Sequence, residues 1–265
     1  MCQVCEITAL GLGEGAAPRF AATSATAPDL QRMAPVNLEA VHGAAAGAMP
    51  EGVGVTGRRT LIKNGTILSM DERVGNHAVG DVLLEGSKIA ELAARIDAPD
   101  AVVIDATGHI VMPGFIDAHS HQFETALRSF LADGILINDG RPESAHNYYE
   151  SILQKLSMGY RPQDVYINEL FSGVAQIDAG VTAVMDISQI HHSPEHSDAA
   201  IEGLRAAGRR AVFGYFEGWG EKAKYPGDAA RIRAQHFASS DQLLSMFMGG
   251  EIYLPGYEEA WKVGR

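Results

Sequence analysis

The stretch that decides the fold is Pro113-Gly-Phe-Ile-Asp-Ala-His-Ser-His121, an apolar segment that ends in two histidines. A β-strand turns residues i and i+2 to the same face, so Asp117, His119 and His121 are expected to point one way. Two imidazoles at this spacing can converge on one cation, and histidine binds zinc, iron and nickel. Because active sites of parallel α/β folds lie at the carboxyl ends of strands, we predict a metal site here, held by His119 and His121.

Downstream of this stretch, strand-like and helix-like segments alternate. Strands are predicted at Val181-Thr-Ala-Val-Met-Asp186 and at Arg210-Ala-Val-Phe-Gly-Tyr-Phe216. Helices are predicted over residues 144–176, with an interruption at Arg161-Pro162, and over 195–209, 229–247 and 257–265. Such alternation is typical of parallel βαβ units, of which three strands are visible.

Upstream of it, residues 60–105 have the pattern of short strands. Thr60 to Ser69 is expected to form two strands joined by a turn at Asn64-Gly65, and residues 81–90 bend at Gly86. Residues 101–105 form a third apolar strand. Residues 1–58 are rich in Ala, Gly and Pro, so we predict an irregular arm with a short helix over 38–46.

Composition excludes several classes of function. The 265 residues include 21 basic and 33 acidic side chains, a net charge of −12, which argues against binding to nucleic acid. No apolar run reaches the length of a membrane span, so no membrane partner is expected. The start of the chain lacks the basic and apolar regions of a secretory signal, which predicts a cytoplasmic location.

The two cysteines stand at Cys2 and Cys5 as a lone C-x-x-C pair. Such a pair binds metal or cycles between redox states in some proteins, but without a second pair the signal is weak. The simpler alternative is an incidental pair on the arm.

A family resemblance rests on the residues around the two histidines. Gly108-His-Ile-Val-Met-Pro-Gly-Phe-Ile-Asp117 leads into the H-x-H pair and follows a β-unit that begins Lys63-Asn-Gly-Thr-Ile67. This arrangement resembles the amidohydrolase superfamily, over residues 59–265. Glu124-Thr-Ala-Leu-Arg128, together with residues 194–204, resembles its chlorohydrolase and deaminase (ATZ/TRZ-like) branch.

The resemblance implies an α/β fold: the N-terminal part of a TIM-like (β/α)8 barrel preceded by half of a small β-sandwich. The domains expected are an arm over residues 1–58, the β-sandwich half over 59–112 and a partial barrel over 113–265. The later strands of the family, with a third metal histidine, a metal aspartate and a general acid–base, have no counterpart before Arg265. We therefore expect a barrel truncated after about three βα units, with the catalytic acid–base beyond residue 265.

The resemblance also implies a metal-dependent hydrolase. His119 and His121 would hold a divalent metal, zinc first and iron as the alternative, with further ligands from later strands. Metal-activated water would cleave a C–N bond, by deamination or amide hydrolysis, or a C–halogen bond of a small N-heterocyclic or amide substrate. The competing hypothesis is a non-catalytic half-barrel that assembles with itself or with a complementary chain. A redox function of the cysteine pair is a third.

Three further residues are candidates for the substrate pocket. His191 and His192 follow the second barrel strand, and Glu217 follows the third, where loops build the pocket of such folds. The alternatives are an exposed loop pair for the histidines and a structural role for Glu217. His236, on an amphipathic helix, is predicted to be a surface or packing residue.

Overall fold

The computed structural model describes residues 49–130, 135–250 and 262. The predicted helix over 38–46, most of the arm, and Cys2 and Cys5 lie outside the described residues, as does the predicted helix over 257–265 apart from Lys262. The chain divides into two compact units between Pro113 and Gly114. No helix in the described ranges is long and apolar enough to span a membrane.

The first unit is a five-stranded mixed sheet with the order β3-β2-β1-β4, and β5 also pairs with β1. Its strands are β1 (Arg59–Ile67), β2 (His77–Glu85), β3 (Lys88–Ala93), β4 (Val102–Asp105) and β5 (Ile110–Val111). β1 to β3 pair antiparallel, whereas β4 and β5 run parallel to β1. Its small core consists of buried Leu61, Leu83, Ile96 and Ala98. The predicted bend at Gly86 is confirmed, because this glycine, at φ 56°, separates β2 from β3.

The predicted turn at Asn64-Gly65 is wrong, because β1 runs through both residues as one strand. Asn64 adopts φ 64°, and the register with β2 shifts between Ile62 and Gly65, which is a β-bulge. Buried Asp81 accepts hydrogen bonds from the Asn64 N–H, at 3.0 Å, and from the Ile96 N–H, at 2.9 Å. Asn-Gly supplies the left-handed backbone that a bulge needs as readily as the one a turn needs.

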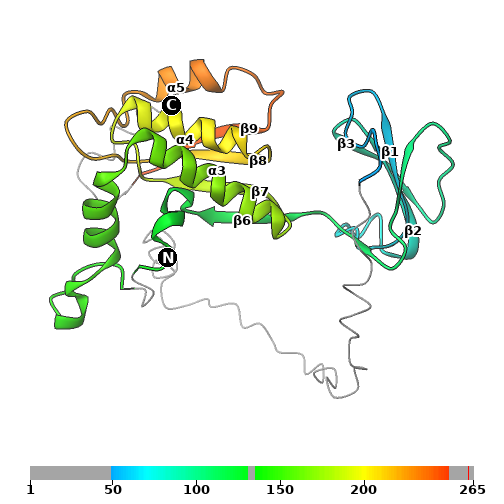
Figure 1. The fold of residues 1–265 in the computed structure, drawn as a ribbon, viewed down its shortest axis with the longest axis horizontal. Helices are drawn as coiled ribbons and strands as arrows, with labels where there is room; N and C mark the ends of the chain where they lie inside the picture. The colour runs from blue at the N-terminus through cyan, green and yellow to red at the C-terminus, as the bar shows by residue number, and fades with distance from the viewer. Residues whose placement is uncertain (1–48, 131–134, 251–261, 263–265) are drawn as a thin grey trace. The chain divides into compact units, whose positions relative to one another are not determined.

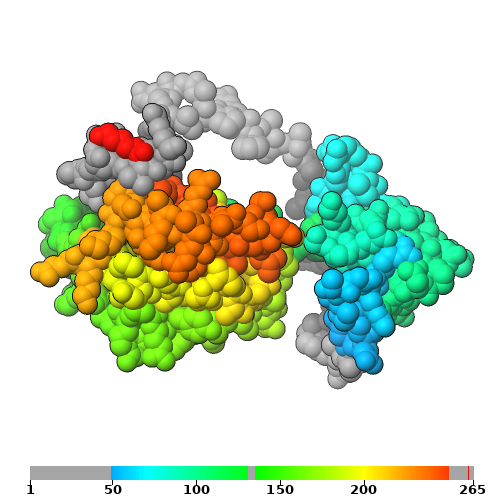
Figure 2. All heavy atoms as spheres, turned by 90° about the horizontal axis from the view of Figure 1, so that it is seen from above, coloured from blue at the N-terminus to red at the C-terminus, as the bar shows by residue number. Residues whose placement is uncertain are grey.

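The second unit is a parallel sheet with the order β6-β7-β8-β9, as α/β alternation predicts. Its strands are β6 (Phe115–Ser120), β7 (Val181–Ser188), β8 (Arg210–Tyr215) and β9 (Leu244–Met248). Helices α3 (Pro162–Asp178), α4 (Pro194–Ala206) and α5 (Ala229–His236) cover one face of the sheet (Figure 1). They appear as adjoining yellow-green, yellow and orange bands in Figure 2. The core between these layers includes Val165, Val184, Ile201, Leu204, Phe213 and Ile232.

The fourth strand corrects the sequence prediction of three parallel strands and of a helix through residue 247. Helix α5 ends at His236, and a bend follows in which the Ser239 hydroxyl accepts a hydrogen bond from the Asp241 N–H. Leu244 then enters the core, and β9 pairs with β8 from Leu244 opposite Ala211 onward. The apolar residues after 243 fit the period of a helix as well as that of a strand, and pairing with β8 selects the strand.

The connection from β6 to α3 consists of short irregular helices. These are the 3₁₀ helices η2 (Gln122–Leu127), η3 (Pro142–Ala145) and η5 (Ser157–Gly159) and the π-helix η4 (Tyr149–Leu156). The predicted break at Arg161-Pro162 is confirmed, since Pro162 begins α3. The Asp164 carboxylate accepts a hydrogen bond from the Arg161 N–H at 2.8 Å and so caps the N-terminus of the helix.

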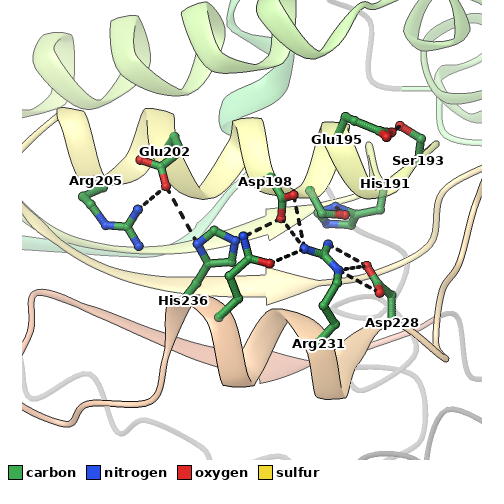
Figure 3. A network of polar contacts seen from close by, with 11 residues as sticks. His191, Ser193, Glu195, Asp198, Glu202, Arg205, Asp228, Arg231 and His236 are labelled. Atoms are coloured by element: carbon green, nitrogen blue, oxygen red, sulfur yellow. Dashed lines mark hydrogen bonds and ion pairs between the residues drawn. The ribbon is translucent and has the colours of Figure 1, made fainter.

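A network of charged side chains joins α4 to α5 on the outside of the unit (Figure 3). The Arg231 guanidinium bridges Asp198 of α4, at 2.9 Å, and Asp228, at 2.7 Å. The His236 Nε2 atom lies 3.0 Å from the same Asp198. His236 itself is only 8% exposed and is therefore a packing residue, one of the two roles predicted for it.

Candidate active site

The carboxyl ends of the four parallel strands define where a site is built. β6 ends at Ser120 and is followed directly by His121, whereas β7 ends at Ser188, just before the His191-His192 pair. β8 ends at Tyr215, two residues before Glu217. His119 lies near the carboxyl end of β6, and His121, His191, His192 and Glu217 follow the ends of β6, β7 and β8. These residues therefore lie at the end of the sheet that carries active sites in this fold class.

The structure brings His119 and His121 together. Their Nε2 atoms lie 3.1 Å apart, and their rings meet edge to face with centroids 5.0 Å apart. The Nδ1 atom of His121 lies 2.8 Å from the Ile187 carbonyl oxygen at the end of β7. Because a carbonyl only accepts, Nδ1 carries the proton, and the Nε2 atom of the neutral His121 ring offers its lone pair toward His119.

Both imidazoles are held in the neutral form that metal binding requires. Burial, and then the neighbouring His119, lower the pKa of His121 to about 4. Burial also lowers the pKa of His119. Near neutral pH neither ring carries the extra proton of an imidazolium, which would have to leave before a cation binds.

The pair fits a divalent cation in its donor chemistry. Two nitrogen ligands of a tetrahedral zinc, each about 2.0–2.1 Å from the ion, lie about 3.3 Å apart. The observed 3.1 Å separation of the Nε2 atoms is close to this value. The backbone carbonyl that fixes the tautomer of His121 is the usual outer partner of a metal-bound histidine. Within the described residues, however, no group of three or more His, Cys, Asp or Glu side chains is placed to hold a metal ion.

Asp117 does not follow the simple alternation that the sequence suggests. Its Cα pairs with Val184, but the next pair is Ser120 with Asp186, so β6 contains a bulge between Asp117 and Ser120. Asp117 Oδ2 accepts a hydrogen bond from the Gln176 amide at 2.9 Å, and the same amide lies 3.4 Å from the Ser120 hydroxyl. Asp117 thus shares a partner on α3 with Ser120, and its other oxygen accepts from the His119 N–H at 3.2 Å.

Four buried polar side chains next to the histidine pair were not found by sequence reasoning. They come from different parts of the unit and are Gln122, Glu169, Asp186 and Arg209. The sequence pointed to only two of them: Gln122 directly follows the H-x-H pair, and Asp186 lies near the end of a predicted strand.

Glu124 belongs to the Glu124–Arg128 stretch on which the branch resemblance rests, but sequence reasoning gave it no role. The Tyr148 hydroxyl donates a hydrogen bond to its carboxylate at 2.6 Å, and burial raises the pKa of Glu124 to about 7. The Tyr148 ring centroid lies 6.4 Å from that of His121, which places this carboxyl and the histidine pair in one neighbourhood.

His191 and His192 occupy different surroundings at the end of β7. His191 is 1% exposed, packs between the Phe213 and Tyr215 rings, and has its Nδ1 atom 3.0 Å from the Ser197 hydroxyl. His192 Nδ1 accepts a hydrogen bond from the Trp219 N–H at 3.0 Å. These contacts join the loops after β7 and β8, while contact of either histidine with a substrate stays a prediction.

Glu217 stands where the loops after β8 and β9 approach each other. A Cβ atom added to Gly250 would lie 3.1 Å from Glu217 Oε1. The next residue, Gly218, lies so close to the loop after β7 that an added Cβ would meet the His191 carbonyl oxygen at 1.9 Å. The structure thus gathers Glu217 with the His191-His192 loop, and a substrate contact of Glu217 likewise stays a prediction.

Comparisons with known proteins agree with this architecture, although no family model matches the chain. A 5'-deoxyadenosine deaminase of Methanococcoides burtonii is 44% identical over 73 residues, which are 28% of this chain and 17% of that protein. A 5-methylthioadenosine/S-adenosylhomocysteine deaminase of Pyrococcus furiosus is 34% identical over 155 residues, 58% of this chain and 33% of that protein. Among solved structures, zinc-bound atrazine chlorohydrolase TrzN of Arthrobacter aurescens TC1 superposes with a TM-score of 0.58 at 20% identity, covering 72% of this chain and 46% of that one.

These matches confirm the resemblance to the amidohydrolase superfamily and its deaminase and chlorohydrolase branch. The structural likeness shows the shared fold. The chain spans less than half the length of these curated relatives and of this neighbour.

Proposed function

We propose that this chain carries the first metal-binding strand of a metal-dependent hydrolase. The reaction class is cleavage of a C–N bond, by deamination or amide hydrolysis, or of a C–halogen bond in a small N-heterocyclic or amide substrate. The single observation that carries the proposal is the His119–His121 pair, whose Nε2 atoms face each other at 3.1 Å at the carboxyl end of a parallel sheet. The deaminase names of the relatives and the chlorohydrolase name of the structural neighbour support it.

In this proposal His119 and His121 hold the ion through their Nε2 atoms, with zinc first and iron as the alternative. A divalent ion bound there supplies the Lewis acidity that activates water for attack on an electrophilic carbon. The Ile187 carbonyl keeps the His121 proton on Nδ1, which leaves Nε2 free of a proton for the ion. The general acid–base is not assigned to any described residue.

Metal content tests this proposal most directly. The full chain is purified, loaded with zinc, dialysed and analysed by atomic spectroscopy beside the variants His119→Ala and His146→Ala. His146 is exposed and lies in the same unit, so its replacement is the matched control. We expect bound zinc in the wild type and the control and a loss of at least about tenfold in affinity for His119→Ala. Zinc that is absent, or retained by His119→Ala, refutes the ligand assignment.

A second candidate function is favoured by the edges of the described sheet. β6 and β9 are its end strands, and on β6 the side chains of Phe115 and Ile116 are 57% and 75% exposed. Exposed apolar strands at a sheet edge pair readily with another chain, which fits an assembly module that works with itself or with a complementary chain. Light scattering after size exclusion separates the two: a monomer that hydrolyses an amide or a halogenated heterocycle contradicts the assembly module.

A further inference from the structure

The four buried polar side chains beside the histidine pair form one connected group. Gln122 comes from η2, Glu169 from α3, Asp186 from β7, and Arg209 from the residue before β8. Glu169 and Asp186 are fully buried, and Gln122 and Arg209 nearly so. Charged side chains are almost never buried this deeply unless they are paired, so their presence calls for a role.

The hydrogen bonds of this group converge on Gln122, the residue after His121. The Gln122 side-chain amide donates to Glu169 Oε2 at 3.1 Å, and its oxygen accepts from the Arg209 guanidinium. The Gln122 backbone N–H donates to Asp186 Oδ1 at 3.3 Å. One residue next to the histidine pair is thus held by three separate elements.

The group brings a basic side chain close to several acidic ones. Arg209 faces Asp186, Asp117 and Glu169, all of which favour its charged form, while burial lowers its pKa. Burial and the neighbouring Asp186 raise the pKa of Glu169 well above its ordinary value. Removal of the guanidinium would take away the cation that lowers the pKa values of Glu169 and Asp186, and also the donor to the Gln122 side-chain oxygen.

Helix α3 also holds the chain on both sides of the histidine pair. Gln176 bonds to Asp117, which precedes the pair, and to Ser120, which lies between the two histidines. After the pair, the Asn168 side-chain oxygen accepts a hydrogen bond from the Ala126 N–H at 2.7 Å. Hydrogen bonds to α3 therefore hold the chain at Asp117, at Gln122 and at Ala126.

We propose that Glu169, Asp186 and Arg209 are positioning residues, which act through Gln122 to hold His119 and His121 with their Nε2 atoms facing each other before any metal binds. That this arrangement serves metal binding rests on the proposed function, but the arrangement of the side chains does not. A site whose ligands are already in place loses less conformational freedom when the ion arrives. In this proposal Glu169, Asp186 and Arg209 act through Gln122 and are not themselves metal ligands.

The test measures the histidine pair in the metal-free full chain. Long-range ¹H–¹⁵N correlation spectra report the tautomer of His121, and hydrogen exchange reports the protection of the backbone amide of residue 122. The variants are Arg209→Met, which removes the guanidinium, and Gln122→Met, which keeps the length and the backbone N–H. Their matched controls are Arg210→Met, at the exposed neighbouring arginine, and Gln163→Met, at an exposed position of α3.

We expect the wild type and both controls to show His121 with its proton on Nδ1 and a protected amide at residue 122. In Arg209→Met and Gln122→Met we expect a mixture of tautomers and exchange at residue 122 that is at least about tenfold faster. A wild-type amide at Gln122 that exchanges as fast as an exposed loop overturns the proposal without any variant. Folded variants with unchanged tautomer and exchange also overturn it, and Gln122→Met decides if Arg209→Met does not fold.

A cobalt titration of the same samples keeps the two proposals apart. If the wild type shows the ordered tautomer but no visible cobalt absorption, the proposed function fails and the positioning group stands. If the wild type binds cobalt, and Arg209→Met binds it with an affinity lower by about tenfold while Arg210→Met does not, the group also matters for the metal. Equal cobalt affinity in Arg209→Met and wild type counts against the positioning role.

Discussion

Replacement of Gly218 by alanine tests whether the loops after β7 and β8 depend on close backbone contact. A Cβ atom at this position would lie 1.9 Å from the His191 carbonyl oxygen, 2.0 Å from its carbon and 2.6 Å from the His192 nitrogen. Ordinary contact begins at 3.4 Å, so the two backbones would have to separate by about 1.5 Å. Since all three atoms belong to the backbone, no change of rotamer relieves the clash.

The expected cost of Gly218→Ala is about 1–3 kcal/mol, the usual range for a methyl group forced into a packed site. Separation of the loops would also break the hydrogen bond from the Trp219 N–H to His192 Nδ1, now 3.0 Å long. A domain of this size loses about 2–4 °C in Tm per kcal/mol. Urea unfolding followed by tryptophan fluorescence measures the loss.

Gly227→Ala is the control, because its added Cβ would meet only the Lys224 carbonyl oxygen, at 3.5 Å. Neither glycine adopts a positive φ angle, so backbone strain is excluded as a cause in both. If Gly218→Ala is as stable as Gly227→Ala, the steric reasoning is refuted.

Three further predictions concern other parts of the chain. Asp81→Ala removes the acceptor of two backbone N–H groups, and we expect urea unfolding to show a loss of about 1–3 kcal/mol, with exposed Asp97→Ala near zero. Burial raises the pKa of Asp186 to about 7, so its folded state keeps a proton that the unfolded state loses near pH 4. The stability that this proton contributes is full below pH 4 and is lost as the pH rises to about 7. Asp186→Asn should therefore gain on the wild type between pH 5 and pH 8 in chemical denaturation, and a constant difference would contradict this. Ile232→Ala, at a fully buried side chain, should cost about 2–5 kcal/mol by calorimetry, and a cost under 1 kcal/mol would mean that the α5 contact is not part of the core.

The parallel sheet was predictable because its signals are local. Gly180, directly before β7, and Gly208, two residues before β8, both have positive φ angles just after a helix, so helix, turn and strand follow one another within a few residues. The start of α3 at Pro162 is equally local, since proline at the first helical position and Asp164 three residues after the cap are sequence signatures.

The missed elements depend on partners far away in the sequence. The bulge at Asn64 is fixed by Asp81, which lies 17 residues away and on another strand. Strand β9 forms because it pairs with β8, and the residues around Leu244 do not reveal this distant partner. In both cases the local pattern allowed two structures and a tertiary contact selected one.

The same difference between local signals and distant contacts explains what could be inferred about the site from the sequence. His119 and His121 are two residues apart, so their convergence follows from strand geometry, although the bulge after Asp117 changes which neighbours share their face. The residues that fix them cannot be found in this way, because Glu169 is 47 residues and Arg209 87 residues from Gln122. A glutamate on a helix and an arginine before a strand are ordinary surface residues in a sequence. Only the packing of α3 and β7 against the end of β6 turns them into the surroundings of the histidine pair, so a mutational search confined to the motif would miss the residues that determine its geometry.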